Sequence, residues 1–290
     1  MRYLLVVTLL WAFSFSLIGE YLAGQVDSYF AVLSRVLIAG LLFLPLTRWR
    51  GVPGGFVRGM LLIGALQFGI TYVCLYLSFA VLTVPEVLLF TILTPLHVTL
   101  IEDAFNRRFN PWALLAALVA VAGAAIIRYD QVSADFFLGF CLLQLANATF
   151  AAGQVFYKHL LVRYPSPAPQ YQRFGYFYLG ALLVVLPAFV VLGNPHKLPS
   201  TPLQWAVLAW LGVVASGIGL YWWNKGASLV DGGTLAVMNN ALVPAGLVVN
   251  LLLWNRDADL LRLALGGAVI AASLLLTGLG QTPRAQKVTA

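Results

Sequence analysis

Two adjacent amides and a proline interrupt an apolar run of membrane-spanning length in the second half of the chain. Asn239 and Asn240 stand shortly before Pro244 in the segment LAVMNNALVPAG. Proline lacks an N–H, and its ring clashes with the carbonyl four residues earlier, so the Asn240 carbonyl should lose its helical partner. A loosened carbonyl beside amide side chains offers several hydrogen-bond donors and acceptors. We favour a binding site for a small polar molecule over a kink whose asparagines bond only a neighbouring helix.

A second site of the same kind lies 149 residues earlier. That shift places Thr91 on Asn240 and Pro95 on Pro244, so that LFTILTPLH and VMNNALVPA share one register. Pro95 should free the Thr91 carbonyl for the same reason. Irregular backbone inside a membrane is tolerated where it lines a cavity or is covered by protein. We therefore predict a midplane binding site where the two segments meet, with both prolines as helix-kink residues.

Further polar side chains fall inside apolar segments, where they are costly and usually functional. Gln144 and Asn147 are three residues apart and share a helix face, as candidates for substrate binding or for contacts between helices. Arg35 lies well inside its segment, and a planar guanidinium suits a carboxylate. Glu20 and His97 are candidate proton carriers. Glu20 is equally a candidate partner for Arg35, and His97 could be purely structural.

A membrane-embedded helical scaffold must position these side chains. The 290 residues are 61% hydrophobic and 9% charged, with a mean hydropathy of +0.89, whereas a soluble domain carries about 25% charged residues. Apolar stretches long enough to cross a bilayer recur along the whole chain. The expected fold class is an all-α integral membrane protein with ten transmembrane helices. They are predicted at 3–21, 29–46, 57–78, 84–101, 111–128, 136–156, 171–193, 203–223, 232–254 and 260–280.

Lysine and arginine positions predict the orientation, because short positively charged loops tend to stay in the cytoplasm. With the N-terminus inside, eleven of these residues lie on the cytoplasmic side and four on the outer side. Both termini are therefore expected in the cytoplasm, with 283–290 as a cytoplasmic tail.

The ten helices divide into a first five-helix repeat at 1–130 and a second at 131–282. Because each repeat has an odd number of helices, the two would insert with opposite topology, as in many secondary transporters. Arg35 and Arg173 lie in the second helix of each repeat. Each could attract an anionic group at one gate, or extend to lipid headgroups.

Two further segments are assigned to packing or to the membrane surface. Small residues in GVVASGIG at 212–219 predict a face where helices approach closely. Trp222 and Trp223 follow three and four residues after this segment and are expected in an interfacial belt.

Other functional classes have little support in the sequence. There is no HExxH motif, and Cys74 and Cys141 match no metal or redox spacing, so we expect neither a metal nor a cofactor. The basic residues are dispersed, which argues against nucleic acid as a partner. No filter loop or ring of charges indicates a channel. A carrier is the leading interpretation, with an intramembrane enzyme as a weak alternative.

Three strings carry a resemblance to known proteins: LLWAFSFSLIGEYLAGQVDSYFAVLSR (9–35), IIRYDQV (126–132) and NKGASLVDGGTLAVMNNALVPAGLVVNL (224–251). Together with two five-helix halves and paired mid-span prolines, they resemble the EamA-type branch of the drug/metabolite transporter superfamily, over essentially the whole chain. Within it they are similar to the bacterial inner-membrane biotin transporters, a subgroup also described as carboxylate, amino acid and amine transporters. The resemblance implies a cavity among the helices other than the fifth and tenth, opening alternately to each side.

It also implies a substrate class. Uptake of biotin across a bacterial inner membrane fits best, with export of amino acids, amines or other small metabolites as the alternative. The neutral ureido group of biotin suits amide side chains and its carboxylate suits Arg35. Its apolar ring suits Phe90, Tyr72 or Tyr221. The expected partners are a small molecule of this class and membrane lipids, and the oligomeric state stays open.

Overall fold

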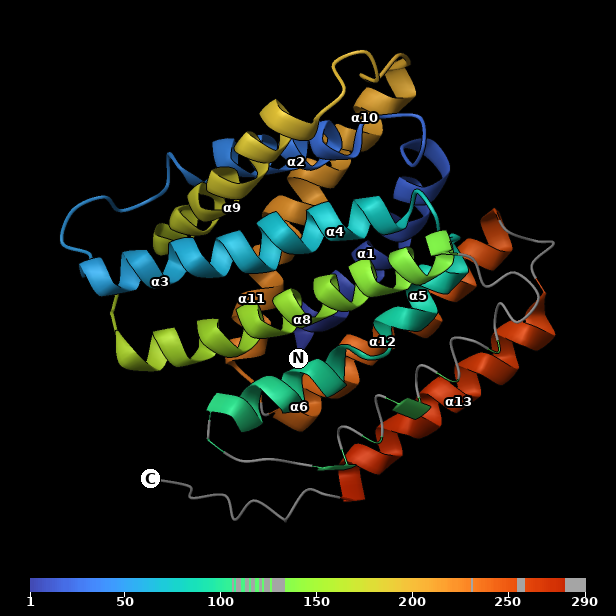
Figure 1. Ribbon diagram of the computed structural model, residues 1–290. Helices are drawn as coiled ribbons and strands as arrows, with labels where there is room; N and C mark the ends of the chain where they lie inside the picture. Colours follow the sequence, from blue (N-terminus) through green and yellow to red (C-terminus); the bar gives the residue numbers. More distant parts are fainter. Residues whose placement is uncertain are drawn as a thin grey trace.

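The computed structural model describes residues 1–105, 134–230, 232–254 and 259–279, and the single positions 107, 111, 112, 115, 118, 119, 122 and 126. The regular structure of these residues is entirely helical, as predicted (Figure 1). The predicted fifth helix at 111–128 lies mostly outside the described residues, and the predicted tail at 283–290 lies wholly outside them.

The first half forms four described spans, of which only the fourth is interrupted. Helices α1 and α2 cover Arg2–Tyr21 and Ser28–Phe43. The third span is continuous from α3 (Gly54–Gly64) through a π-helical segment, η1 (Ala65–Ile70), into α4 (Thr71–Ser78). The fourth consists of α5 (Val84–Thr91) and α6 (Thr94–Phe105).

The second half begins with two long helices, α8 (Ala134–Arg163) and α9 (Tyr171–Leu192). Its third span again contains a π-helical segment, since α10 (Pro202–Trp210), η3 (Leu211–Gly219) and α11 (Leu220–Ser228) follow without a gap. Helices α12 (Gly232–Leu253) and α13 (Leu260–Leu279) complete the described chain. Among the described residues, six spans are long and apolar enough to cross a membrane, and three shorter apolar helices accompany them.

Three predicted boundaries were wrong for local reasons. The sixth helix was expected to end at 156, but α8 continues to Arg163 because no helix breaker occurs before Pro165. The second was expected to reach 46, but α2 ends ahead of Pro45. The fourth was expected at 84–101 with a kink at Pro95, but it continues to Phe105 and divides at Ile92 and Leu93 into α5 and α6.

Polar side chains at the helix starts explain where several spans begin. The Asp27 carboxylate accepts a hydrogen bond from the Phe30 N–H at 2.8 Å and caps α2. Glu86 Oε2 accepts from the Thr83 N–H at 2.7 Å as part of a capping box.

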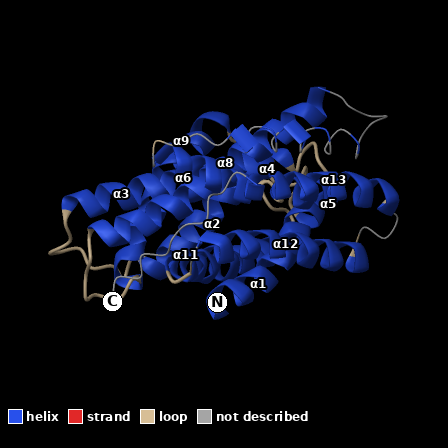
Figure 2. Cartoon of the chain, turned by 90° about the horizontal axis from the view of Figure 1, so that it is seen from below, coloured by secondary structure: helices blue, strands red, loops and turns tan. Residues whose placement is uncertain are grey.

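The helix contacts of the two halves match one another (Figures 1 and 2). The contact between α1 and α12 corresponds to the contact between α8 and α6. In the same way, the contact between α3 and α9 corresponds to the contact between η3 and α2. Two repeats related by a two-fold axis give this pattern. Backbones approach closely where α3 meets α9, because a Cβ on Gly64 would overlap the Phe177 carbonyl. Helix α13 lies at the edge of the bundle beside α5 and α6.

Candidate substrate cavity

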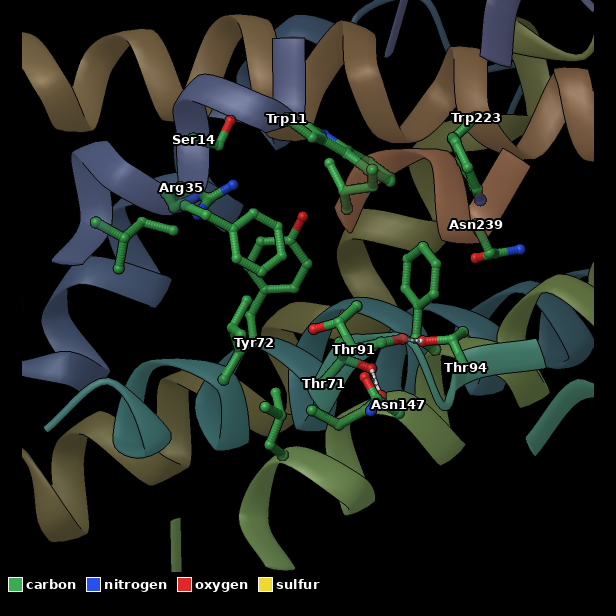
Figure 3. A pocket seen from close by; sticks show the side chains of 17 residues that line it. Trp11, Ser14, Arg35, Thr71, Tyr72, Thr91, Thr94, Asn147, Trp223 and Asn239 are labelled. Carbon is green, nitrogen blue, oxygen red and sulfur yellow. Dashed lines mark hydrogen bonds between the residues drawn. The ribbon is translucent and has the colours of Figure 1, made fainter. Parts of the chain in front are cut away.

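A cavity with an empty volume of about 670 Å³, its mouth included, lies between helices of both halves (Figure 3). Its lining comes from α1, α2, α4, α5, α6, α8, α11 and α12, and consists of Trp11, Ser14, Phe15, Ile18, Arg35, Thr71, Tyr72, Leu75, Thr91, Thr94, Leu143, Ala146, Asn147, Phe150, Trp223, Asn239 and Leu242. Five of the predicted binding residues are among them: Arg35, Tyr72, Thr91, Asn147 and Asn239.

One end of the cavity is cationic. Arg35 is 1% exposed; its Nε donates to Ser216 Oγ at 2.8 Å and its Nη1 to the Tyr76 hydroxyl at 3.1 Å. Its Cζ lies 4.5 Å from the centre of the Tyr72 ring. A guanidinium has five N–H donors, so donors remain for a ligand. Because no carboxylate is among its hydrogen-bond partners in the described chain, and a buried charge without a counter-ion is costly, an anionic ligand would stabilise this end.

The predicted pairing of Arg35 with Glu20 is therefore not formed. Glu20 is half-buried near the end of α1 and does not belong to the cavity lining. Ser216, assigned above to helix packing, has the second role of holding the guanidinium from η3. The sequence offered no signal for this contact, because it joins residues 181 positions apart.

The opposite end carries amides. Asn147 Nδ2 donates to the Phe90 carbonyl oxygen at 3.0 Å and to Gln144 Oε1 at 3.3 Å. Gln144 Oε1 is also 3.1 Å from His97 Nε2. Gln144 and His97 therefore lie behind the lining and contact it through Asn147.

The two neighbouring asparagines of α12 have different environments. Asn239 is buried at the lining, and it forms a reciprocal amide pair with Gln154 at 3.1 and 3.3 Å and donates to the Leu235 carbonyl at 2.9 Å. Asn240 does not belong to the lining, and its Oδ1 is buried without a partner among the described residues. Residues adjacent on a helix point about 100° apart, so one asparagine faces the cavity while the other does not.

The predicted loosening at Pro95 is visible in the backbone. In a regular helix the Thr91 carbonyl would accept a hydrogen bond from the N–H of residue 95, which proline lacks. Here it accepts one from Thr94 Oγ1 at 2.7 Å instead. In contrast, α12 passes through Pro244 without a break, and the Pro244 side chain is exposed.

Aromatic rings line the cavity, but most are not the predicted ones. Trp11 and Trp223 lie with ring centres 4.9 Å apart, and Phe15 and Phe150 are also in the lining. Trp223 is 1% exposed, so its predicted place in an interfacial belt was wrong. Its position on an internal helix face could not be inferred from a WW pair that is typical of an interface.

Two predicted rings lie elsewhere. The Phe90 ring packs against Phe136 and Phe140, and only the backbone of Phe90 contacts the site, through Asn147. The Tyr221 ring lies between Phe43 and Phe174, with ring centres 5.4 and 5.3 Å away.

Comparison with known proteins now assigns the family. The profile of the EamA-like transporter family matches residues 1–129. A "Probable biotin transporter" of Pseudomonas aeruginosa is 71% identical over 97% of this chain and 98% of its own length. The chain belongs to the EamA-like transporters.

More distant similarities agree with this assignment. The "Biotin transporter" of Salmonella typhimurium is 53% identical over 94% of this chain and 91% of its own, and that of Escherichia coli K12 is 51% identical over 99% and 96%. A solved structure described only as "Crystal structure of protein" shares the fold, with a TM-score of 0.66 at 18% identity over 96% of both chains. The protein is thus a multi-pass membrane protein of the drug/metabolite transporter superfamily that moves a small metabolite.

Proposed function

We propose that this EamA-like transporter imports biotin across a bacterial inner membrane. The observation that carries the proposal is the separation of polar groups in the cavity: Arg35 lies at one end and Asn147 and Asn239 at the other, with aromatic rings between (Figure 3). Biotin has the same division, with a carboxylate on an aliphatic chain, an apolar ring and a neutral ureido group. Relatives that bear the name biotin transporter and are 51–71% identical to this chain support the same substrate.

In this proposal each end of the cavity recognises one end of the substrate. The carboxylate bonds the unused N–H groups of Arg35, where a bidentate contact adds geometric selectivity. The apolar ring packs among Trp11, Phe15 and Phe150. The ureido group reaches the end that carries Asn147 and Asn239, where polar groups of the lining replace part of its hydrogen bonding to water.

Transport would proceed by alternating access between two inverted repeats. We place these repeats at 1–130 and 131–282, with both termini and the tail at 283–290 in the cytoplasm, as the charge distribution predicts. Moving one anion inward against the membrane potential costs about 2.3 kcal/mol per 100 mV. Accumulation therefore requires a coupled cation or metabolic trapping of the product, and we propose His97 or Glu20 as the carrier of a coupled proton.

Uptake of labelled biotin by a bacterial host without its own biotin transporter tests the proposal. Expression should raise uptake well above the background, and uptake at the background level would reject the proposal. Amino acids and amines form the second arm: resistance to toxic analogues of these compounds on expression, without biotin uptake, would indicate an exporter instead.

A further inference from the structure

The hydrogen bonds around Asn147 determine which atom of its amide is left for a ligand. Both N–H groups of Nδ2 have acceptors within the protein, the Phe90 carbonyl oxygen and Gln144 Oε1. Exchanging Oδ1 and Nδ2 would bring an oxygen against these two oxygens, so the orientation is fixed. Asn147 therefore offers Oδ1, which accepts hydrogen bonds and cannot donate them.

Most donors in the same part of the lining already have partners. The hydroxyls of Thr71, Thr91 and Thr94 each donate to a backbone carbonyl, at 2.9, 2.7 and 2.7 Å. Trp11 Nε1 donates to the Ala215 carbonyl at 3.0 Å. The threonine oxygens can accept a hydrogen bond from a ligand and the Trp11 ring can pack against it, but none of these groups has a free N–H or O–H.

Trp223 is the exception. Its side chain lies on the Asn239 side of the lining, far from Arg35 (Figure 3). It is almost fully buried, and its Nε1 has no hydrogen-bond partner among the described residues. A buried donor without a partner costs about 1–3 kcal/mol, and a buried tryptophan N–H usually has one. Because Trp223 belongs to the cavity lining, a ligand seated against the edge of its ring would supply the missing acceptor.

We propose that Asn147 and Trp223 recognise the two parts of one neutral polar group: Asn147 Oδ1 accepts from an N–H of the substrate, and Trp223 Nε1 donates to its carbonyl oxygen. This inference rests on the proposed function and narrows the substrate class. The substrate is a carboxylate that carries a urea or amide at its far end. An ammonium group there would leave Trp223 unpaired, because it has no lone pair to accept a hydrogen bond.

Binding of three analogues to the purified protein, measured by calorimetry against biotin, tests the two contacts. Desthiobiotin keeps the ureido group and lacks the sulfur. Lipoate keeps the carboxylate chain on an apolar ring and lacks the ureido group. Biotin methylated on a ureido nitrogen lacks one N–H. The wild-type protein should bind desthiobiotin nearly as well as biotin, and the other two at least tenfold more weakly.

The variants separate the two contacts. Trp223→Phe should weaken biotin binding roughly tenfold and leave lipoate binding unchanged, because only the ureido carbonyl loses a donor. Trp222→Phe is the matched control, since Trp222 is the neighbouring tryptophan, packs against Tyr3 and does not belong to the lining; it should not change the binding of biotin or of lipoate. Asn147→Leu should bring biotin and its N-methyl derivative to equal affinity.

Three results would overturn the inference. If Trp223→Phe discriminates between biotin and lipoate as the wild type does, Trp223 is not the donor. If wild-type protein binds lipoate as tightly as biotin, no ureido recognition exists, and this comparison holds even where a variant fails to fold. A wild-type protein that binds neither biotin nor desthiobiotin would overturn the proposed function itself.

Discussion

Arg35 and Arg173 lie in the second helix of each half, and both are buried, yet their surroundings differ. Arg35 lines the cavity with its guanidinium beside Tyr72. Arg173 lies over the Phe56 ring at 4.5 Å and donates from Nη1 to the Tyr164 carbonyl at 3.2 Å, away from the lining. The two halves therefore share a helix arrangement without sharing the polar residues that use it.

The matched prolines differ in the same way. The span that contains Pro95 divides into α5 and α6 beside the cavity, whereas α12 is continuous past Pro244. In an inverted repeat, corresponding elements have equivalent places in the bundle. A difference between two matched residues therefore indicates which of the two the cavity depends on. Each matched pair thus provides a functional variant and its control in one molecule.

The arginine pair should give the largest effect. Arg35→Gln removes the charge that the carboxylate needs, and losing one partner of a buried charge pair costs about 2–5 kcal/mol. We expect biotin uptake to fall about a hundredfold, by the conversion of about 1.4 kcal/mol per factor of ten. Arg173→Gln should change uptake much less once it is normalised to the amount of transporter in the membrane. Equal losses in the two variants would show that Arg35 is no more than a structural arginine.

The asparagine pair should give the next effect. Asn239→Leu leaves Gln154 without its amide partner in the cavity wall, and a buried polar group without a bond costs about 1–3 kcal/mol. Uptake and thermal stability should both fall, whereas Asn240→Leu should be milder. Adding Gln154→Leu to Asn239→Leu should restore stability but not uptake, because replacing both partners by apolar groups can be nearly neutral. A double variant with normal uptake would remove Asn239 from the site.

The sequence predicted the helical class and most of the described spans, because these follow from hydropathy and charge. It predicted the region of the cavity from the matched prolines and the amides beside them. Of the residues that it proposed for substrate binding, Arg35, Asn147, Asn239, Tyr72 and Thr91 line one cavity. It could not choose between Asn239 and Asn240, since that depends on the rotation of α12 about its axis. The sequence did not predict that Trp11 and Trp223 line the cavity. Their positions depend on contacts between distant residues, such as that of Trp11 with the Ala215 carbonyl 204 positions away, and the hydropathy pattern does not predict such contacts.

The proline pair tests whether the break between α5 and α6 is needed. Pro95→Ala supplies an N–H that can bond the Thr91 carbonyl, which would compete with Thr94 and favour a continuous helix. We expect the apparent affinity for biotin to fall several-fold, because Thr91, Thr94 and the Phe90 carbonyl that holds Asn147 would all shift. Pro244→Ala should be nearly silent, since α12 is already unbroken. A larger effect of Pro244→Ala would show that the second proline acts in another state of the transport cycle.

The smallest effect is expected at His97, for which the second half has Gly246 at the matching position. A proton carrier at His97 would therefore exist in one half alone, and it would act on the substrate through Gln144 and Asn147.

His97→Gln should lower the accumulation ratio of biotin two- to threefold in vesicles with an imposed proton gradient. This loss is small, because a membrane potential of 100 mV contributes about 2.3 kcal/mol per charge and changes the accumulation ratio by a much larger factor. Exchange of labelled for unlabelled biotin without a gradient should stay unchanged, because it needs no net proton movement. The Glu20→Gln variant provides the contrast. Glu20 does not belong to the lining, and no hydrogen bond among the described residues joins its side chain to it, so this variant should retain full accumulation. If Glu20→Gln loses accumulation and His97→Gln keeps it, the coupling site lies at the end of α1, and the chain from His97 to Asn147 serves only to orient the amide.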